Sequence, residues 1–469
     1  MTVITTDDTN VNRSVALFVA TLSSFFTPFM ASSINIALPT IAAEFQMNAV
    51  LLSWIATSYL LAAAMFLVPF GKIADIYGRK KIFGYGMAIY TLASLLSAIS
   101  QDSTQLLITR VLQGLGGSML FGTAIAILTS VFPPSERGKV LGINVAAVYS
   151  GLSLGPFLGG FLTQHFGWRS IFLINFFLGL LVVIVVCWKL KGEWAEARGE
   201  KFDVIGSLIY SVMLVALMYG FSLLPKRSGG WLVLSGLVGI VAFIGWELRV
   251  ADPILNIRLF RHNKVLTFSN LAALINYSAT AAVAFLLSLY LQYLKGRRPQ
   301  EAGLILVAQP IVMAIFSPLA GRLSDSIEPR IVASVGMALT VVGLVMLIFL
   351  NENTAILFLI GNLVLLGFGF AFFSSPNTNA VMSSVEKKFY GVASATLATM
   401  RLLGQMLSMG IAMLIFALVI GKVQITPDKY GVFLRSCQIA FSIFAVFCLA
   451  GIFASLARGR LRNGAELKR

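Results

Sequence analysis

The chain has 469 residues, of which 58% are hydrophobic and only 12% are charged, and its formal net charge is +16 at pH 7. Soluble domains carry about 25% charged residues, so this composition excludes an ordinary soluble protein and indicates a polytopic helical membrane protein. The cations cluster in alternate loops between apolar runs, which argues against a nucleic-acid partner. Because the sequence shows no nucleotide-binding loop, metal cluster or nucleophile constellation, we expect no enzymatic activity, no cofactor and no metal.

Apolar runs long enough to cross a bilayer recur from end to end and predict fourteen spans. They fall at residues 14–38, 51–70, 82–99, 105–131, 140–162, 170–190, 203–224, 231–250, 265–294, 301–321, 331–350, 354–380, 391–421 and 433–457. Most of the 35 Lys and Arg lie in the inner loops and tails if both termini are cytoplasmic, with Lys295-Gly296-Arg297-Arg298 as the main exception. We therefore expect a multi-pass protein of the cytoplasmic (inner) membrane.

The connection between the second and third spans is the most informative stretch of the chain. It reads Gly71-Lys72-Ile73-Ala74-Asp75-Ile76-Tyr77-Gly78-Arg79-Lys80-Lys81 and is expected to be a short turn facing the cytoplasm. Asp75 is at helical spacing from Arg79, so it can pair locally or face a helix N-terminus. The spacing G-x-x-x-D-x-x-G-R-K-K resembles the signature loop of the major facilitator superfamily, although Ile76 replaces a usual basic residue. This resemblance implies an all-α fold of two six-helix bundles and makes Asp75 and Arg79 candidates for a conformational switch.

The fourth span contains a cation, Arg110, which is costly to bury unless it is paired or hydrated. Gln113 follows it by three residues, on the same helical face. Arg110 is therefore a candidate for a cavity or a proton relay; the alternative is that its long side chain snorkels to the outer interface. The pattern R-x-x-Q-G-x-G resembles the fourth-helix motif of the superfamily, and the resemblance links this arginine to proton coupling in antiporters.

Small residues dominate the middle of the fifth span, where Gly151, Gly155 and Gly159 recur every four positions. This spacing makes a flat face for close helix packing, and Pro156 removes a backbone donor and can kink the helix. The pattern G-x-x-x-G-P-x-x-G-G resembles the antiporter motif of exporters in the superfamily, which is uncommon in its uptake symporters. The run Gly167-Trp168-Arg169-Ser170-Ile171-Phe172 resembles the turn before the sixth helix in the fourteen-helix drug:proton antiporter branch.

The spans divide into groups of six, two and six. The longest polar run between spans, residues 189–202, should end the first group, and Gly71-Lys72-Ile73-Ala74-Asp75 is echoed by Gly321-Arg322-Leu323-Ser324-Asp325 near the end of span ten. Repeated halves of this kind commonly bind substrate between them, near the bilayer midplane. The predicted organisation is an N-terminal six-helix bundle over 1–190, a cytoplasmic linker with two extra transmembrane helices over 191–264, a C-terminal six-helix bundle over 265–457, and a basic cytoplasmic tail over 458–469.

The first span departs from the antiporter branch at an acidic position. The branch usually reads L-D-x-T-[IV]-V-N-[VI]-A-L-P, whereas this chain has Met30 in place of the acid, and none of its 19 acids lies near a predicted midplane. A lipophilic cation would need a buried countercharge, so two membrane arginines without such acids favour a neutral or anionic substrate over a dication. Proton coupling would then use a peripheral acid such as Asp75, Glu44 or Glu301, or substrate competition at Arg110.

The substrate pocket is expected among the polar and aromatic side chains of the spans. Each of these side chains could equally form hydrogen bonds between helices instead of contacting a substrate. Arg401, in span thirteen, either lines the cavity or lies near the inner surface, and Met30 would make one side of the cavity apolar and adaptable. The candidate substrate-binding residues are Met30, Ser33, Asn35, Trp54, Tyr149, Asn276, Tyr277, Tyr290, Gln292, Gln309 and Arg401. The candidates for proton coupling or conformational switching are Asp75, Arg79, Arg110, Gln113, Gly151, Gly155, Pro156 and Gly159.

The resemblance covers nearly the whole chain and implies a secondary active exporter of amphipathic small molecules, of the multidrug efflux type, that works by alternating access with protons as coupling ion. Two alternatives remain: an exporter of an endogenous anionic or neutral metabolite or lipid with weak or no proton coupling, and a non-transporting receptor or scaffold on the same fold. The expected partners are the substrate, protons and the lipid bilayer, and a monomer suffices for this architecture.

Overall fold

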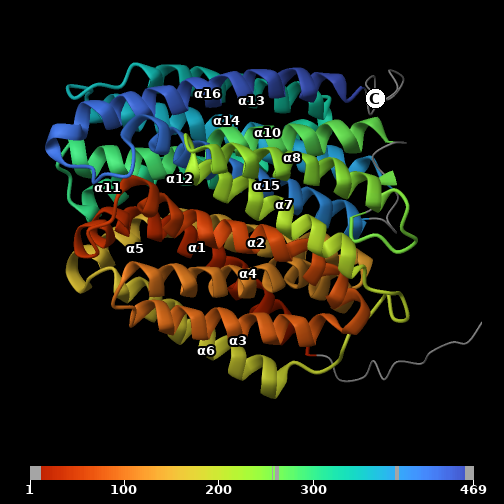
Figure 1. Ribbon diagram of the computed structural model, residues 1–469. Helices are drawn as coiled ribbons and strands as arrows, with labels where there is room; N and C mark the ends of the chain where they lie inside the picture. The colour runs from red at the N-terminus through yellow and green to blue at the C-terminus, as the bar shows by residue number, and fades with distance from the viewer. Residues whose placement is uncertain (1–11, 256, 259–262, 386–389, 460–469) are drawn as a thin grey trace, which may run out of the picture.

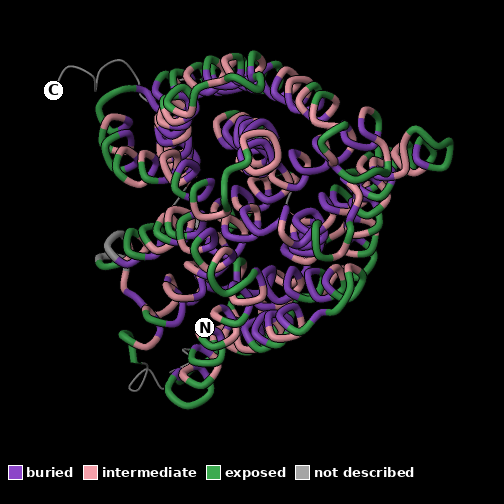
Figure 2. Tube along the Cα trace, turned by 90° about the vertical axis from the view of Figure 1, so that its left-hand side faces the viewer, coloured by how far each residue is buried: buried purple, intermediate pink, exposed green. Residues whose placement is uncertain are grey.

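The structure is a computed structural model that describes residues 12–255, 257–258, 263–385 and 390–459. Within those ranges the chain is helical, without strands, and its long helices run side by side along one axis (Figure 1). Seen end-on, buried residues gather where helices face one another and exposed residues mark much of the periphery (Figure 2). This is the arrangement expected of a helical protein whose outer surface contacts lipid.

The first six long helices form the N-terminal bundle. α1 packs against α5, α2 against α4, and α3 against both α4 and α6. Polar residues in the short connections cap the N-termini of two of these helices. Asn48 caps α2 by accepting a hydrogen bond from Leu51 N, and Asp102 caps α4 by accepting one from Gln105 N. The bounds are α1 (Arg13–Glu44), α2 (Ala49–Tyr77), α3 (Arg79–Ala98), α4 (Ser103–Val131), α5 (Pro134–Phe166) and α6 (Arg169–Lys189).

Two further helices, α7 (Val204–Leu223) and α8 (Arg227–Glu247), form a hairpin between the bundles. In Figure 1 the pair lies between the red-to-orange N-terminal helices and the blue C-terminal helices. α7 contacts α2 of the first bundle and α15 of the second, and Tyr210 donates a hydrogen bond to the Ala64 carbonyl at 3.1 Å. The hairpin therefore has contacts with both bundles.

The remaining helices form the C-terminal bundle, in which α10 packs on α15 and α16, and α14 packs on α12 and α13. Two of its spans end in π-helical turns, Tyr290–Leu294 after α10 and Phe416–Ile420 after α15. The bounds are α10 (Lys264–Leu289), α11 (Pro299–Leu306), α12 (Ala308–Ser326), α13 (Pro329–Ile348), α14 (Ile356–Ser383), α15 (Tyr390–Ile415) and α16 (Tyr430–Ala457), with a short 3₁₀ turn at Pro427–Lys429.

The predicted fourteen-span architecture is confirmed, with α11 and α12 together forming the tenth span. Thirteen of the described helical segments are long and apolar enough to cross a membrane, and α3, with its basic first turn, is the fourteenth span. Several helices extend past the predicted edges because polar residues continue the helix beyond the apolar run. One expectation was wrong: Gly71–Asp75 is not a turn but the end of α2, and only Gly78 separates α2 from α3.

The predicted basic tail was also expected to begin at Arg458, but this residue is folded into the bundle and is 1% exposed. Its guanidinium donates to the Ser455 carbonyl at 2.8 Å, Asn377 Oδ1 at 3.2 Å and Ser269 Oγ at 3.3 Å. Burial lowers the pKa of Arg458 to about 10. The rest of the predicted tail, residues 460–469, lies outside the described residues.

Candidate functional site

Arg110 is enclosed by the N-terminal bundle and is 1% exposed. Its Nε donates to the Ile55 carbonyl at 3.0 Å, its Nη1 donates to Gln113 Oε1, and its guanidinium carbon lies 4.5 Å from the centre of the Tyr59 ring. Gln113 in turn donates to Ser94 Oγ at 2.9 Å. The snorkelling alternative is therefore wrong, because neutral acceptors and an aromatic face hold this cation between α2, α3 and α4.

Arg401, the second arginine of the membrane interior, has different surroundings. It is partly buried and lies eleven residues into α15, about 16 Å from the start of that helix. Its Nη2 donates to Thr378 Oγ1 at 2.5 Å, and its guanidinium carbon lies 5.7 Å from the centre of the Tyr277 ring. Tyr149 of α5 is close enough to Tyr277 for their hydroxyls to interact electrostatically. The partner Thr378 lies five residues before the end of α14, and the neighbours of Arg401 come from α10 and α14.

The glycine face of α5 packs against α1, as predicted for a small-residue stripe. A Cβ on Gly151 would lie 2.4 Å from a backbone carbonyl of α1, one on Gly155 would lie 1.8 Å from Ser32 Oγ, and one on Gly159 would lie 2.7 Å from Ser33 Cα. Ser33 Oγ also donates to the Gly155 carbonyl at 2.9 Å. Any larger residue would force α1 and α5 apart.

The same segment of α5 also contacts the C-terminal bundle. A Cβ on Gly303 of α11 would lie 2.1 Å from the Pro156 carbonyl oxygen, and a Cβ on Gly160 would lie 2.5 Å from the Pro299 carbonyl oxygen. Both obstacles are backbone atoms, so α5 and α11 touch without intervening side chains. The G-x-x-x-G-P-x-x-G-G motif therefore contacts α1 on one side and the opposite bundle on the other.

Further hydrogen bonds join the two bundles at the predicted outer end. Ser288 Oγ donates to the Asn35 carbonyl at 2.6 Å, and Gln292 Nε2 donates to the Ile36 carbonyl at 2.9 Å. The main chain of Ala49 at the start of α2 donates to a carbonyl of the α15–α16 connection at 2.9 Å. These contacts and the α5–α11 contact describe a conformation that is closed at the outer end.

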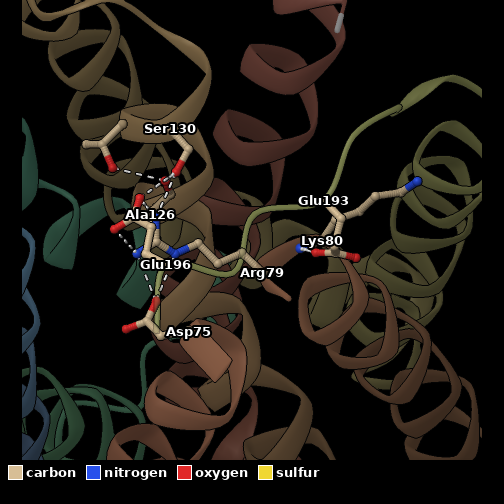
Figure 3. A network of polar contacts seen from close by, with 8 residues as sticks. Asp75, Arg79, Lys80, Ala126, Ser130, Glu193 and Glu196 are labelled. Carbon is tan, nitrogen blue, oxygen red and sulfur yellow. Dashed lines mark hydrogen bonds and ion pairs between the residues drawn. The ribbon is translucent and has the colours of Figure 1, made fainter. Parts of the chain in front are cut away.

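Arg79 anchors a polar network at the predicted cytoplasmic end (Figure 3). Its Nε donates to Asp75 Oδ1 at 2.8 Å, its Nη1 donates to Ser130 Oγ at 2.7 Å, and Nη1 and Nη2 donate to the Glu196 carboxylate at 2.7 and 2.9 Å. Only 9% of the Arg79 side chain is exposed. The local pairing of Asp75 with Arg79 is confirmed, and the same guanidinium connects α4 and the segment after α6.

That segment, residues 191–203, lies across the α2–α3 junction, and we call it the clamp segment. Main-chain hydrogen bonds run from Arg79 N to the Trp194 carbonyl at 2.8 Å and from Ala197 N to the Asp75 carbonyl at 2.9 Å. Sequence reasoning assigned this segment only as a separator of bundles, because no local pattern reveals its distant partners. Its three glutamates each bind the basic junction: Glu193 accepts from Lys80 N, Glu196 pairs with Arg79, and Glu200 pairs with Lys72.

Gly78 is required where the clamp segment crosses the junction. Its φ of +124° is a backbone conformation that residues with a side chain rarely adopt. A Cβ at this position would also lie 2.4 Å from the Glu193 carboxylate. The break between α2 and α3 is therefore compact enough for a carboxylate to reach the first backbone N–H groups of α3, which carry the positive end of the helix dipole.

Several predicted substrate-binding residues lie inside a bundle. Met30, at 1% exposure, accepts a hydrogen bond at Sδ from Asn175 Nδ2 at 3.4 Å. Asn276 is fully buried and its Nδ2 lies 4.0 Å from a cysteine sulfur of α16. Tyr290 is fully buried and donates to a carbonyl of the α13–α14 connection at 2.7 Å. The structure therefore places these three residues, with Ser33, in helix packing rather than around Arg401.

Two other predicted residues lie away from the Arg401 neighbourhood. Trp54 packs on Tyr219 of the α7–α8 hairpin, with ring centroids 6.4 Å apart. Gln309 is partly buried in α12, where its carbonyl faces Gly367 of α14. Asn35 and Gln292 belong to the outer contact described above. Of the predicted substrate-binding set, the structure therefore brings Arg401 and Tyr277 together, with Tyr149 close enough to Tyr277 for an electrostatic interaction.

The burial of one carboxyl group, that of Glu247, could not be predicted from the sequence. Glu247, the last residue of α8, is fully buried, and its Oε2 accepts from Leu255 N at 2.9 Å. Asp203, which caps α7, lies beside it, since a Cβ on Gly206 would meet both carboxylates. Among the described residues no cation forms an ion pair with Glu247. No sequence signal indicates that Asp203 adjoins this acid.

Comparisons with known proteins cover nearly the whole chain. A family model described as Major Facilitator Superfamily matches residues 20–266 and 269–467. Riboflavin transporter RibZ of Clostridioides difficile (strain 630) is 28% identical over 445 residues, which are 94% of this chain and 96% of the relative. Multidrug resistance protein Stp of Mycobacterium tuberculosis (strain CDC 1551 / Oshkosh) is 31% identical over 405 residues, which are 84% and 74% of the two chains. A solved bacterial homolog of the human lysosomal transporter Spinster, in an inward-facing and unoccupied conformation, has a TM-score of 0.69 and 16% identity over 95% of this chain and 97% of its own.

Proposed function

The chain belongs to the Major Facilitator Superfamily, and from that membership we propose that it is a secondary active exporter of amphipathic small molecules that works by alternating access. The observation that carries the proposal is the contact of the α5 motif with α11. Gly160 and Gly303 bring two backbones together across the bundles with no side chain between them. A contact made of small residues can separate and re-form without exposing large side chains, which suits a junction that opens in each cycle.

The outer contacts support alternating access in a second way. The hydrogen bonds from Ser288 and Gln292 to carbonyls of α1 are neutral, and each carries a net free energy of about 0.5–1.5 kcal/mol. A few such bonds stabilise a closed outer end by an amount that substrate binding can overcome. At the other end, charged groups of the clamp segment and the α2–α3 junction hold each other within the N-terminal half. This asymmetry favours rigid-body movement of one bundle against the other.

Export, rather than uptake, is supported by the small-residue motif and by the names of relatives. Multidrug resistance protein Stp and the Tetracenomycin C resistance and export protein of Streptomyces glaucescens both match most of this chain. Multidrug-type efflux by proton antiport at the cytoplasmic membrane is therefore the function that we propose first. A monomer with both termini in the cytoplasm suffices for it.

The second candidate is export of an endogenous anionic or neutral metabolite with weak or no proton coupling. It is favoured by Met30, which is buried at the position where an acid is usual in the drug antiporter branch. The relative RibZ is named for riboflavin, which is a metabolite and not a drug. Only the charge preference of this protein and its response to a proton gradient separate the two candidates.

Four carboxyl groups are candidates for carrying the coupled proton. Glu44 pairs with Arg169 at 2.7 Å, Asp75 pairs with Arg79, and Glu301 lies 3.6 Å from Arg297. Each of these three carboxylates already has an arginine partner in the structure. The remaining candidate, Glu247, is buried next to another carboxylate, and both features favour the protonated form.

The experiment that tests the proposed function is uptake into inside-out proteoliposomes under a proton gradient imposed in either direction. A lipophilic cation, a neutral amphiphile and an organic anion are measured in parallel. Gradient-driven accumulation supports antiport, and flux that does not respond to the gradient supports the second candidate. Absence of flux for all three classes, with correctly inserted protein, would refute the proposal of an exporter and favour a receptor or scaffold.

A further inference from the structure

The two arginines of the membrane interior differ in how far the protein uses their hydrogen-bonding capacity. Arg110 is 1% exposed and directs Nε and Nη1 to a carbonyl and an amide oxygen, with an aromatic ring at its face. Arg401 is partly exposed and bonds one hydroxyl, that of Thr378, through Nη2. Its Nε is buried and has no hydrogen-bond partner among the described residues. Arg110 is therefore engaged in packing, whereas Arg401 retains donors for a further acceptor.

An unpaired guanidinium inside a membrane protein is energetically costly, so the missing partner of Arg401 is informative. A buried donor without an acceptor costs about 1–3 kcal/mol, and more when it is charged. Among the described residues no carboxylate forms an ion pair with Arg401, and the neighbours that the structure gives it are Thr378 and the face of Tyr277. An anion would satisfy both the charge and the free donor.

Arg401 lies on the cytoplasmic side of the predicted outer contact in the conformation that the structure shows. Tyr277 precedes Ser288 by eleven residues on α10, so it lies about 16 Å from the outer contact toward the predicted cytoplasmic end. Tyr149, on α5 of the other bundle, is close enough to Tyr277 to interact with it electrostatically. Arg401 and the two tyrosines therefore lie between the bundles, on the cytoplasmic side of the outer closure.

We propose that Arg401, flanked by Tyr277, Tyr149 and Thr378, binds the anionic group of the transported substrate, and that the substrate is an amphipathic organic anion with a carboxylate, sulfonate or phosphate next to an aromatic or apolar body. The guanidinium binds such a group in a bidentate manner. The tyrosine rings provide faces on which an aromatic body stacks. This inference rests on the proposed function, because it assigns the substrate class of the same exporter.

Binding of matched dyes to the purified full-length protein tests the proposal. Fluorescein is an anionic xanthene at pH 7.4, and rhodamine 123 is a cationic xanthene of similar size. Fluorescence polarisation should show tighter binding of fluorescein than of rhodamine 123. Arg401→Gln should weaken fluorescein binding about tenfold or more while leaving rhodamine 123 binding unchanged or tighter, because a charge-assisted hydrogen bond is lost. Arg401→Lys keeps the charge and should lie between the two.

Matched controls separate the site from general effects of charge. Arg435→Gln removes an exposed arginine of α16 and should leave the affinity for both dyes unchanged. Thr378→Val removes the hydroxyl that holds the guanidinium but keeps the cation, so a smaller loss specific to fluorescein is expected. If Arg401→Gln does not fold, Arg401→Lys and Thr378→Val carry the test. Preference for rhodamine 123, no binding of fluorescein, or equal effects on both dyes would overturn the proposal.

Transport of the same dyes in proteoliposomes distinguishes failure of this inference from failure of the proposed function. Fluorescein binding that depends on Arg401 without flux would leave the anion site in place and refute the exporter. Export of rhodamine 123 or of a neutral dye, with no dependence on Arg401, would support the exporter and refute the anion site. Flux of fluorescein that falls in parallel with its affinity in the variants supports both.

Discussion

Replacing Gly303 by alanine should shift the protein toward a conformation that is open at the outer end. The new Cβ would lie 2.1 Å from the Pro156 carbonyl oxygen, a backbone atom that cannot rotate away. To regain ordinary contact at about 3.5 Å, α5 and α11 must separate by roughly 1.4 Å. Overpacking of this kind costs about 1–3 kcal/mol, and only the outer-closed state bears the cost. The ratio of closed to open protein should therefore fall by about 5- to 150-fold, at 1.4 kcal/mol per tenfold.

The assay is a distance measurement between spin labels at Phe166 and Arg298, exposed positions at the facing ends of α5 and α11, in a background without the native cysteines. Gly303→Ala should add a longer distance that the parent protein populates little. Gly361→Ala is the matched control, because a Cβ at that helical glycine meets nothing within 4 Å. An unchanged distance distribution in Gly303→Ala, with unchanged transport, would show that the α5–α11 contact does not hold the outer end closed.

Three further predictions concern the polar networks. Glu196→Gln removes an ion pair whose carboxylate side chain is 67% exposed, so the free energy of unfolding should fall by less than about 1 kcal/mol. Limited trypsin digestion of the clamp segment should become faster. Digestion at the parent rate would contradict a clamping role. Arg110→Ala should abolish transport in a protein that still elutes as a folded species, because Gln113 and the Ile55 carbonyl lose the partner that joins α2 to α4. Near-normal flux would show that these contacts are not needed for the transport cycle. Asp75→Asn weakens the hold on Arg79 and should lower the rate of transport more than substrate affinity, which kinetic and binding titrations compare; an equal loss of both would argue against a switch.

Much of the fold could be predicted because its determinants are local. Twenty-residue apolar runs define the spans, and the four-residue spacing of Asp75 and Arg79 correctly indicated an ion pair. The glycine stripe of α5 indicated close packing for the same reason, since Gly151 and Gly155 share one helical face. In each case the partner lies within a few residues along the chain, or any neighbouring helix would suffice.

The remaining features depend on contacts between distant parts of the chain, which no periodicity encodes. The sequence left open whether Arg110 faces a cavity or snorkels to the interface, because its partner, the Ile55 carbonyl, lies 55 positions away. Glu196 looked like one more charge in a polar connection, yet it is the main carboxylate partner of Arg79, 117 positions away. The close approach of Gly303 to α5 likewise required the packing of the two bundles. Single residues of the site were identifiable from the sequence, whereas their assembly was not.

The basic first turn of α3 has a consequence for how the protein enters the membrane. α3 is not among the thirteen helices whose hydropathy alone suffices for a span, and Arg79 at its start is held by a carboxylate of the clamp segment. During synthesis that carboxylate leaves the ribosome more than a hundred residues after Arg79. Until then Arg79, Lys80 and Lys81 keep the α2–α3 hairpin oriented by their charge alone, through their preference for the cytoplasmic face. The ion pairs then fix an orientation that the nascent chain has already adopted.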